Sequence, residues 1–468
     1  MPAGPLPSRA PVAVLGGGVT GLAAAWHLHR AGLEVAVFES SARVGGVVET
    51  ISEGGWLHEG GPNSLLEGSD GLGALLAALG LADRRLYAAD AARHRYVLRG
   101  GRLRAMPVSP SSFLGTNLFS WRAKLGLASE IIRPRRREPG DESVADFTRR
   151  RLGQEFLDYA VDPFVGGVYA GDPARLSVRH AFPKLARLEE RHGSLLRGAI
   201  CQRNPGGGPR GRIFSFPQGL QELTWALAAP LGAALRLGAR AEVLRAAAGG
   251  WEVTFEQGGE WRSAVFSDVV CALPAAALAR LRFEGIPQPP SLACLTEIDH
   301  PPVASVFTGF RREDVVHPLD GFGMLIPWRE GRSILGTLFS SSLFPGRAPA
   351  GHVALTTFVG GTRQPHNGLL EDGRLLELVR GELTALAGAR AQPVYVSIRH
   401  HVRAIPQYNL GHQRFLDACA RAEASAPGIH LGGACRDGVS LPACLASGQR
   451  MAEAAIRRRL QARATPDS

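Results

Sequence analysis

The residues most suited to chemistry lie near the start of the chain, between Val12 and Gly46. Gly16, Gly18 and Gly21 form a G-x-G-x-x-G array directly after an apolar run. The first glycine permits a tight turn, the second lets a pyrophosphate approach the backbone, and the third lets a helix pack on a strand. A helix that begins there offers free N–H groups and its positive dipole end to phosphates. The array in this setting predicts dinucleotide binding.

An acid follows the second apolar segment, 35–38. Glu39 lies at the expected end of a strand, where its carboxylate can accept hydrogen bonds from ribose hydroxyls. An acid rather than an arginine at this point argues against a 2′-phosphate. Glu39, Arg43, Gly45 and Gly46 together read E-x-x-x-R-x-G-G, which resembles the flavoprotein amine-oxidase superfamily, in which the nucleotide is FAD. From the residues alone, Arg43 fits an ordinary solvated turn as well.

A second match to the glycine array serves as a control. Residues 206–211 also fit G-x-G-x-x-G, but no strand precedes them and Pro209 interrupts them. We therefore predict a flexible loop there.

Composition sets limits on the class of protein. The chain has 468 residues, enough for two or three domains, with 45% hydrophobic and 20% charged residues, as in soluble globular proteins. No apolar run reaches the roughly 18 residues that a membrane-spanning helix needs. The first eleven residues lack the hydrophobic core of a signal peptide. Six scattered cysteines without a CxxC pair indicate neither disulfides nor a metal site, so we expect a reducing cytoplasm.

The net charge of +11 is concentrated in arginine runs, at 133–137, 149–151 and 457–459. Such runs usually form solvated faces. No nucleic-acid signature accompanies them, so we expect no nucleic-acid partner. An anionic membrane surface or an acidic substrate explains the surplus better.

The elements that must position these residues give an α/β fold class, α+β overall. We expect strands at 251–255, 268–274, 354–359 and 429–434, a helix beginning within 214–223, and a helix from Ala443. Residues 105–205 read as mainly helical, and Asp141 is the expected cap of a helix through 144–152. Within them, aromatic and aliphatic residues of 113–132 stand beside Arg122 and Lys124. That pattern suits a bilayer interface and, from the pattern alone, core packing equally well.

Nearly the whole chain resembles the protoporphyrinogen oxidase family. The resemblance rests on 16–28, 39–46 and 59–64, then on the VYAGDPARLSVRHAFPKL block at 168–185, IPQYNLGH at 405–412 and the tail at 432–448. The nucleotide motifs are shared by the wider superfamily. The Tyr169–Asp172 block and IPQYNLGH are the more particular ones.

The resemblance implies non-covalent FAD. Cys435 lies in the tail, but its spacing gives no reason for a covalent flavin bond. The implied cofactor-binding residues are Gly16, Gly17, Gly18, Val19, Thr20, Gly21, Glu39, Ser40, Arg43, Gly45, Gly46, Gly60, Gly61, Pro62, Asn63, Val243, Gly433, Val439, Ser440 and Leu441.

The resemblance also implies a substrate pocket. Arg95 matches an arginine that pairs with a substrate propionate, and the carbonyl of Gly167 matches one that faces the substrate. Gly166 stands where the family can carry a larger residue, so this wall of the pocket is expected to be roomier. The residues expected to sandwich the tetrapyrrole are Phe322, Gly323, Met324, Leu325, Leu338 and Phe358. Without the resemblance, Arg95 reads as a surface arginine and the apolar residues read as core.

The implied activity is oxidation of protoporphyrinogen IX to protoporphyrin IX in haem biosynthesis. Six electrons leave the substrate, three H2O2 are released, and hydride passes to flavin N5 without a dedicated catalytic side chain. One cation beside apolar residues favours protoporphyrinogen IX over coproporphyrinogen III, although Arg332 or Arg363 could reach the pocket. The alternatives are coproporphyrinogen III oxidation, an amine oxidase or carotenoid desaturase, and a non-enzymatic, flavin-stabilised membrane scaffold.

The resemblance implies three domains as well. They are a discontinuous Rossmann-like FAD-binding domain (12–90, 208–275 and 425–468), a helical membrane-binding domain (105–205) and a sheet-containing substrate-binding domain (91–104 and 276–424). We expect peripheral attachment to the inner face of the cell membrane, with ferrochelatase and a second copy of the chain as candidate partners.

Overall fold

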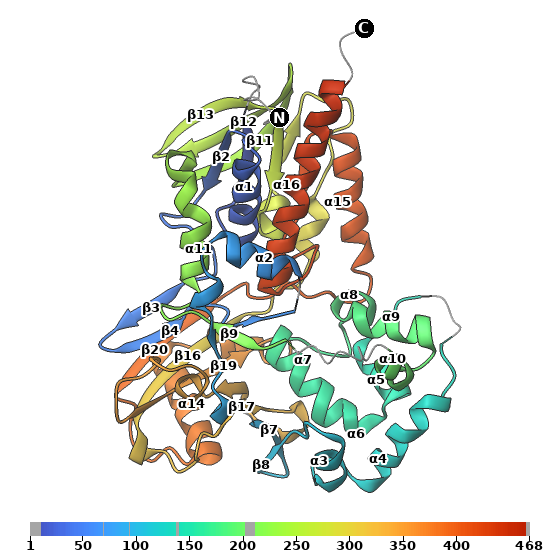
Figure 1. Cartoon of the computed structure of the whole chain (residues 1–468), viewed down its shortest axis with the longest axis vertical. Helices are drawn as coiled ribbons and strands as arrows, with labels where there is room; N and C mark the ends of the chain where they lie inside the picture. Colours follow the sequence, from blue (N-terminus) through green and yellow to red (C-terminus); the bar gives the residue numbers. More distant parts are fainter. Residues whose placement is uncertain (1–10, 69, 93, 137–139, 202–210, 465–468) are drawn as a thin grey trace.

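In the computed structural model, which describes residues 11–464 except 69, 93, 137–139 and 202–210, five parallel strands form the upper sheet (Figure 1). The apolar runs of the three central strands are buried on both faces, as is usual for parallel strands. The expected α/β class is confirmed. In sheet order the strands are β10 (Leu235–Leu237), β2 (Val35–Glu39), β1 (Val12–Leu15), β14 (Asp268–Cys271) and β21 (Ile429–Leu431).

Helices α1 (Val19–Arg30) and α16 (Leu441–Ala464) pack together on one face of this sheet. A Cβ on Gly448 of α16 would overlap the carbonyl oxygen of Thr20 in α1, so the close approach requires glycine. Residues from the two ends of the chain therefore build one core, as the blue and red helices of Figure 1 show.

A mainly antiparallel layer, in which only β15 runs parallel to its neighbour, covers the other face. Trp251, Val253 and Phe255 alternate inward and pack with Phe38 of the parallel sheet, which confirms the strand expected at 251–255. The strands are β13 (Glu260–Phe266), β12 (Gly250–Gln257), β11 (Ala239–Ala247) and β15 (Arg282–Glu284), and helix α15 (Gln413–Ser425) packs on the same core.

A seven-stranded sheet fills the lower left of Figure 1. Helix α14 (Asp372–Ala387) covers one of its faces, through Leu375, Val379 and Leu383. The strand expected at 354–359 lies within β19. In sheet order the strands are β20 (Tyr395–His401), β16 (Val303–Arg311), β19 (His352–Gly360), β18 (Ile334–Leu338), β17 (Gly321–Leu325), β7 (His94–Arg99) and β8 (Arg102–Ala105).

Shorter elements join the two large sheets. They are β3 (Thr50–Glu53), β4 (Trp56–Glu59), β5 (Leu65–Leu66), α2 (Asp70–Ala78), β6 (Leu86–Tyr87), β9 (Ile213–Ser215), α11 (Gln221–Ala228), α12 (Ala275–Leu278) and α13 (Ser340–Leu343). The helix expected to begin within 214–223 is α11, which follows a short strand. The glycine-rich control at 206–211 lies outside the described residues, apart from Gly211.

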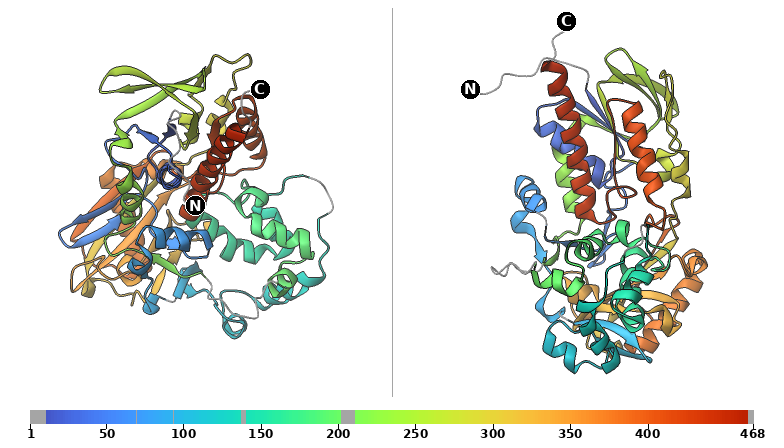
Figure 2. Two further views of the ribbon diagram at one scale, coloured as in Figure 1. Left: turned by 45° about the horizontal axis from the view of Figure 1, so that its top comes forward. Right: turned by 90° about the vertical axis from the view of Figure 1, so that its right-hand side faces the viewer.

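Residues 110–201 form a helical segment at the lower right of Figure 1, as the sequence predicted for this region, and Figure 2 shows it beside the lower sheet. A π-helical turn, Leu157–Val161, joins α6 to α7, a feature often found at functional sites. The helices are α3 (Pro110–Gly115), α4 (Trp121–Ala128), α5 (Val144–Arg151), α6 (Gln154–Phe156), α7 (Asp162–Tyr169), α8 (Val178–Ala181), α9 (Pro183–His192) and α10 (Leu195–Cys201).

The cap expected of Asp141 was wrong. Ser143 caps α5, because its Oγ accepts a hydrogen bond from the Asp146 N–H at 3.0 Å. The Asp141 carboxylate instead accepts hydrogen bonds from Ser177 Oγ and the Gly411 N–H. Its role is therefore to join the helical segment to residues 405–412.

Among their described residues, two of the arginine runs are only partly solvated, with Arg135 and Arg149 exposed. Arg151 is fully buried and forms an ion pair with the equally buried Glu130. Arg150 forms ion pairs with Glu142 and Glu189, and Arg133 donates to the carbonyl oxygens of residues 150 and 151. Much of the basic charge in these runs therefore holds the helical segment together.

The apolar residues of 113–132 divide between core and surface. Leu118 and Phe119 are buried against Phe156, so the interfacial reading was wrong for them. Lys124 is buried too, and its Nζ donates to two backbone carbonyls. The exposed residues, which we call the apolar patch, are Leu114, Trp121, Leu125 and Ile132.

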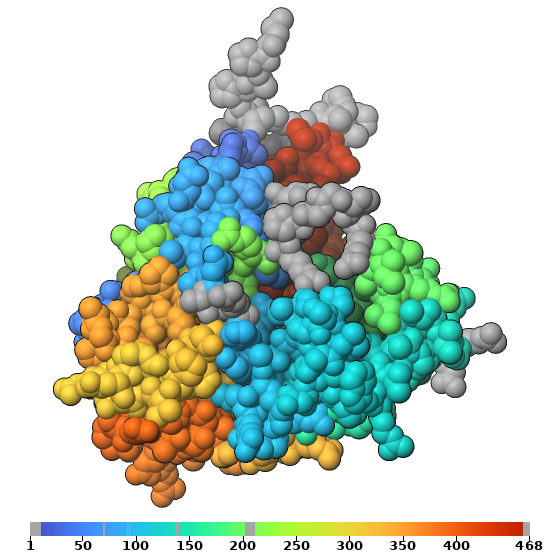
Figure 3. Space-filling view, turned by 60° about the horizontal axis from the view of Figure 1, so that its bottom comes forward, coloured from blue at the N-terminus to red at the C-terminus, as the bar shows by residue number. Residues whose placement is uncertain are grey.

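The helical segment that carries this patch is the cyan and teal part that Figure 3 shows beside the orange lower sheet. Among the helices of residues 11–464 that the structure describes, none is both long and apolar enough to cross a bilayer.

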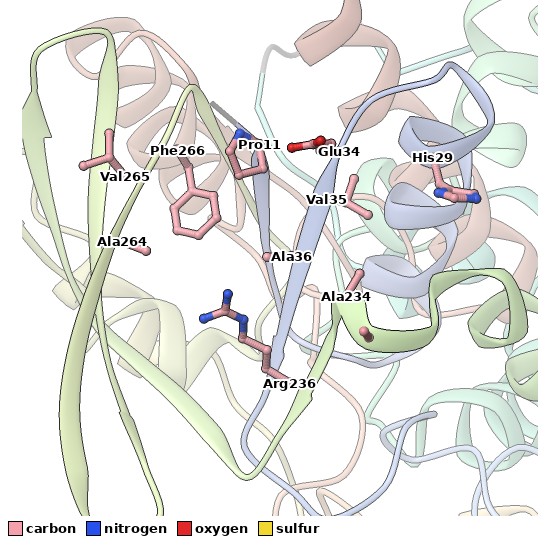
Figure 4. Close-up of a pocket in the computed structure, with 11 residues that line it drawn as sticks. Pro11, His29, Glu34, Val35, Ala36, Ala234, Arg236, Ala264, Val265 and Phe266 are labelled. Atoms are coloured by element: carbon pink, nitrogen blue, oxygen red, sulfur yellow. The ribbon is translucent and has the colours of Figure 1, made fainter. Parts of the chain in front are cut away.

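A groove of about 420 Å³ opens between the parallel sheet and β13 (Figure 4). Val35 and Ala36, at the start of β2, line it together with Arg236 and Phe266. Glu39 and the glycine array lie at the opposite ends of these strands. The groove is therefore separate from the candidate site.

Candidate active site

The glycine array lies at the carboxyl ends of the parallel strands, where open α/β sheets bind their ligands. Gly16 has a φ of 102°, and a Cβ there would lie 2.6 Å from the Ala272 carbonyl oxygen. A Cβ on Gly21 would overlap the carbonyl oxygen of Gly16. These two glycines are therefore required by the packing of α1 on the sheet.

Gly18 differs from its neighbours, because no atom lies within 4 Å of the position its Cβ would occupy. Gly18 is also the N-cap of α1 and provides no side-chain cap for the N–H groups of Val19, Thr20 and Gly21. Uncapped donors beside open space are what a pyrophosphate needs. The start of α1 therefore has the free donors and the open space that suit the pyrophosphate of a dinucleotide.

Glu39 is oriented at the end of β2 by the glycine loop itself. Its Oε2 accepts the Gly17 N–H at 2.7 Å, and its Oε1 accepts the N–H and Oγ of Ser41 at 2.8 and 2.7 Å. Ser40 Oγ lies 3.4 Å from the same oxygen. The half-buried carboxylate keeps acceptor capacity for ribose hydroxyls.

Arg43 orders the loop that follows. It donates to the carbonyl oxygens of Val44, Gly46 and Val48 and forms a 3.2 Å ion pair with Glu49. The Gly45 N–H donates to the Gly17 carbonyl at 2.8 Å, which brings residues 45–46 against the glycine array. Arg43 thus contributes to the site at least through the backbone it holds.

Residues 60–63 complete this side of the site. A Cβ on Gly61 would overlap the Val47 carbonyl oxygen, and the Gly60 N–H donates to Glu49. Asn63 Nδ2 donates back to the Gly61 carbonyl at 3.0 Å, next to Pro62. These residues therefore lie against the 39–49 loop, as the resemblance requires.

The tail brings a second helix start to the same place. The Gly433 N–H donates to Asp437 Oδ2 and Ser447 Oγ, and a Cβ on Gly433 would lie 4.0 Å from Thr20 Oγ1. Ser440 accepts the Ala443 N–H at 3.3 Å at the start of α16, between Val439 and Leu441. Val243 lies apart, at a β-bulge of β11 that packs beside β2.

The IPQYNLGH motif holds this tail loop in place. Tyr408 Oη donates to the Ala434 carbonyl at 2.5 Å and accepts the Gly438 N–H at 2.8 Å. His412 Nε2 contacts the Cys435 carbonyl at 3.1 Å, and Gln407 donates to the Tyr169 carbonyl. Burial lowers the pKa of His412 to about 4 and raises that of Tyr408, so both are neutral. The motif thereby ties the end of α7 to the tail loop.

The expected substrate residues share one face of the lower sheet. Strand pairing aligns Arg95 with Gly323 and Leu338 in one row across the sheet, and Leu325 with Gly336 and Phe358 in the next. Successive residues point to opposite faces, so the side chains two apart lie on the same side. Phe322, at a bulge, packs with Leu338, while Met324 faces the core under α14. Met324 is therefore not part of this face.

Helix α7 packs over β17 and β18 on the same side. A Cβ on Gly167 would lie 2.6 Å from Leu325 Cδ2, so glycine permits this approach. At Gly166 the nearest atom would be Leu335 Cδ2, at 4.0 Å, which leaves the extra room expected there. Within the described residues no hydrogen bond reaches the Gly167 carbonyl oxygen.

Arg95 is exposed, and its guanidinium lies over the ring of Phe322, 5.5 Å from the centroid. Arg332 and Arg363, the other cations considered for this pocket, are already paired. Arg332 contacts Glu382, and Arg363 bridges Asp162 at 2.5 Å and Asp172 at 2.8 Å. Burial alone would raise the pKa of Asp172, but the hydrogen bond from Arg363 lowers it. Arg363 therefore fixes both ends of α7.

A buried acid–base pair joins the 59–63 segment to the lower sheet. Glu59 and Arg347 are each about 4% exposed and 3.7 Å apart, and Arg347 Nη1 has no hydrogen-bond partner. Burial raises the pKa of Glu59 to about 7 despite hydrogen bonds from Thr50 and Leu220. A cavity of about 20 Å³ beside them is also lined by Asn63 and Leu338. It holds about one water and no larger group.

Sequence reasoning missed several residues of this site. Phe164 and Val168, one turn apart on α7, are exposed apolar side chains near the expected Gly167, and helical spacing could have identified them. The Glu59–Arg347 pair joins residues far apart in the chain, so no local signal pointed to it. Tyr408 lay within a motif that had been singled out but given no role.

Cys435 is buried among apolar side chains, and burial raises the pKa of its thiol to about 12. A neutral, enclosed thiol suits packing rather than attachment of a flavin.

Three comparisons place the chain among known proteins. A family model described as flavin-containing amine oxidoreductase matches residues 19–456. The chain is similar to a mitochondrial protoporphyrinogen oxidase of Nicotiana tabacum, at 34% identity over 95% of this chain and 94% of the relative. It is also similar to a coproporphyrinogen III oxidase of Bacillus subtilis, at 28% identity over 94% and 96% of the two chains.

Among solved structures, a crystal structure from Exiguobacterium sp. 255-15, provisionally assigned as a protoporphyrinogen oxidase, has a TM-score of 0.80 and 26% identity. The match covers 95% of this chain and 98% of the other. The fold and the sequence therefore point to the same group of flavoproteins.

Proposed function

Because the chain belongs to the flavin-containing amine oxidoreductase family, we propose that it oxidises protoporphyrinogen IX to protoporphyrin IX with O2 as the electron acceptor. Its cofactor is FAD, and the relatives support an enzyme of porphyrin biosynthesis. The observation that carries the choice of substrate is that Arg95, exposed and without an ion pair among the described residues, lies at one end of a strip of apolar side chains. That arrangement suits a molecule with carboxylates on one edge only.

The cofactor-binding residues proposed are those at which α1, the 39–46 loop, residues 60–63 and the tail meet. The N–H groups at the start of α1 would bind the pyrophosphate, and Glu39 would accept hydrogen bonds from the ribose. When bound, the flavin supplies the redox chemistry, taking electrons from a meso carbon and passing them to O2. Removal of six electrons takes three such rounds and forms three H2O2.

The protein's own contribution is positioning. Arg95 would bind a propionate, while Phe322, Leu325, Leu338 and Phe358 would enclose the apolar part of the ring and exclude water. The free carbonyl of Gly167 would accept a hydrogen bond from a pyrrole N–H, which fixes the macrocycle relative to α7. No side chain needs to act as a base, because pyrrole protons can leave to water.

Coproporphyrinogen III carries two further carboxylates in place of the vinyl groups. Burying them without partners costs several kcal/mol each, so additional cations would be needed. Arg332 and Arg363 are engaged with acids, and the cavity beside Arg347 is too small for a propionate. These observations favour protoporphyrinogen IX.

The test compares the two porphyrinogens on purified FAD-loaded protein. We expect a higher kcat/KM for protoporphyrinogen IX, with three H2O2 formed per porphyrin. Arg95→Ala should raise KM and leave the flavin content unchanged, since it removes an ion pair rather than a hydride-transfer group. A preference for coproporphyrinogen III would overturn the choice of substrate. Flavin reduction by amines, but by neither porphyrinogen, would favour an amine oxidase.

Non-covalent binding of FAD is tested separately. Heat or acid denaturation should release yellow flavin into the supernatant. Gly18→Ala should lower flavin content without unfolding the protein, because the space it fills is empty of protein atoms. Gly115→Ala in α3, which also fills open space, is the matched control. Colour that stays with the precipitated chain would contradict this proposal.

We propose peripheral membrane attachment through the apolar patch of Leu114, Trp121, Leu125 and Ile132. Arg122, which is exposed beside Trp121, would face anionic headgroups and contribute on the order of 1 kcal/mol.

A further inference from the structure

A second arginine lies beside Arg95 on the substrate-facing side of the lower sheet. In the antiparallel β7–β8 pair, Arg104 stands opposite Val97, and the Met106 N–H donates to the Arg95 carbonyl at 2.7 Å. Arg95 and Arg104 are therefore diagonal neighbours. Such pairs have Cβ atoms roughly 7–8 Å apart.

Both side chains project from the same face of the sheet. Val97 packs with Phe119 and Leu325 under the helical segment, whereas Tyr96 and Leu98 pack on the opposite face under α14. Arg95 shares the side of Val97 by alternation, and Arg104 shares it as the paired residue. The two arginines thus stand at one end of the rows that contain Leu325, Leu338 and Phe358.

In the part of the chain that the structure describes, neither guanidinium has an anionic partner. The Arg95 guanidinium lies over the Phe322 ring, and Arg104 forms no ion pair. Arg104 is half-buried, and its Nε is enclosed without a hydrogen-bond partner. Arg99, on the same strand face, is paired with Glu155 at 2.5 Å. Two adjacent unpaired cations, one of them desolvated, repel each other unless an anion lies between them.

We infer that Arg95 and Arg104 together bind the two propionate carboxylates on one edge of the tetrapyrrole, an assignment that rests on the proposed function. A planar guanidinium binds a carboxylate through two parallel hydrogen bonds. One such contact leaves the macrocycle free to pivot about it. Two contacts fix its orientation, with the carboxylate edge at β7–β8 and the apolar edge over Leu338 and Phe358.

The experiment measures binding of protoporphyrin IX to the FAD-loaded protein by fluorescence, for the parent and for Arg104→Gln. We expect Arg104→Gln to raise Kd and KM about tenfold or more, with unchanged flavin absorbance. Arg102→Gln is the matched control, since it removes the same charge from an exposed position two residues away on the same strand face. It should stay within about twofold of the parent. Protoporphyrin IX dimethyl ester, which lacks both charges, should bind the parent and Arg104→Gln equally.

Three results would overturn the inference: unchanged affinity in Arg104→Gln, equal losses in Arg104→Gln and Arg102→Gln, or discrimination against the dimethyl ester by Arg104→Gln. A parent protein that neither binds protoporphyrin IX nor oxidises its porphyrinogen would instead contradict the proposed function. Should Arg104→Gln lose its flavin, Arg104→Lys gives the test. Arg104→Lys keeps the positive charge but lacks the planar guanidinium, so its affinity for protoporphyrin IX should lie between that of the parent and that of Arg95→Ala. An affinity equal to that of the parent would count against the assignment.

Discussion

Two buried glutamate–arginine pairs, one in the helical segment and one where residues 59–63 meet the lower sheet, differ in how completely the carboxylate is hydrogen-bonded. Glu130 accepts hydrogen bonds from Ser194 Oγ and from the N–H groups of Leu195 and Leu196, besides its pairing with Arg151. Burial alone would raise its pKa, but these hydrogen bonds lower it. Glu59 has fewer donors, its arginine is 3.7 Å away, and its pKa is raised to about 7.

The difference separates structural burial from burial near the site. The Glu130 carboxylate is saturated with donors, although Arg151 Nε has no hydrogen-bond partner, and its pair with Arg151 holds α5, α10 and the 129–132 turn together. The Glu59–Arg347 pair lies beside a small cavity lined by Asn63 and Leu338, and Glu59 changes protonation near neutral pH. Perturbed groups of the second kind are concentrated at functional sites.

The largest expected effect on stability comes from loss of the Glu130–Arg151 ion pair. Arg151→Ala leaves Glu130 buried without its cation and should lower the free energy of unfolding by about 3–5 kcal/mol. Urea denaturation measures this. Arg149→Ala is the control, because its ion pair with Asp146 is exposed and should contribute roughly 0.5 kcal/mol or less. Equal losses in the two variants would mean that the Glu130–Arg151 pair has no special role.

The Glu59–Arg347 pair should make the free energy of unfolding depend on pH. The folded state keeps the Glu59 proton up to about pH 7, whereas an unfolded glutamate releases it near 4.5. The contribution of Glu59 to the free energy of unfolding is therefore full below pH 4.5 and is lost as pH rises through 7. Glu59→Gln should gain stability relative to the parent by up to about 1.4 kcal/mol per pH unit between these values.

Glu130→Gln provides the contrast, because the pKa of Glu130 is lowered. The difference in free energy of unfolding between Glu130→Gln and the parent should shrink as pH falls, not as it rises. Denaturation curves of both variants from pH 8 down to below pH 4.5 decide the matter, because Glu130 titrates only below 4.5. Two differences that change with pH in the same direction would end the distinction between the pairs.

A smaller effect is expected where IPQYNLGH bridges the two regions. Tyr408→Phe leaves the Ala434 carbonyl and the Gly438 N–H without their partner and should cost about 1–2 kcal/mol. The tail loop should hold flavin less tightly, so the flavin Kd should rise while the KM for porphyrinogen stays close to that of the parent. An unchanged flavin affinity would limit Tyr408 to the stability of the helical segment.

The smallest change in stability is expected at the apolar patch. Trp121→Asp with Leu125→Asp should alter the free energy of unfolding by roughly 0.5 kcal/mol or less, because both side chains are exposed. The same variant should float less with anionic liposomes, and added salt should weaken flotation of the parent. Phe119→Asp should unfold the helical segment instead. Undiminished flotation of the double variant would move the membrane contact elsewhere.

The sequence predicted best what the backbone alone determines. The array from Gly16 to Gly21, the strand to Glu39 and the start of α16 depend on glycine geometry and continuous apolar runs, which are local properties. The assignments that were wrong concerned side chains whose partners lie far along the chain. Phe119 is buried because of Phe156, Arg151 because of Glu130, and Asp141 is engaged by Ser177.

The substrate face lies between these cases. Its rows arise from pairing of β7 with β17, which are more than two hundred residues apart, so strand patterns could not place Arg95 beside Gly323. Only the family resemblance brought these residues together in advance. The position of Arg104, which depends on the same register, was not foreseen.

The sheet order has a consequence for how the protein is made. Strand β1 pairs with β14, β14 pairs with β21, and α16 packs on α1, so the first strand completes its layer only with the last described strand and helix. At a synthesis rate of about 5–20 residues per second, β1 waits tens of seconds on the ribosome for its final neighbours. Capture of the cofactor is therefore a late event in the life of each new chain. Until then the apolar strands β1 and β2 are a natural substrate for chaperones.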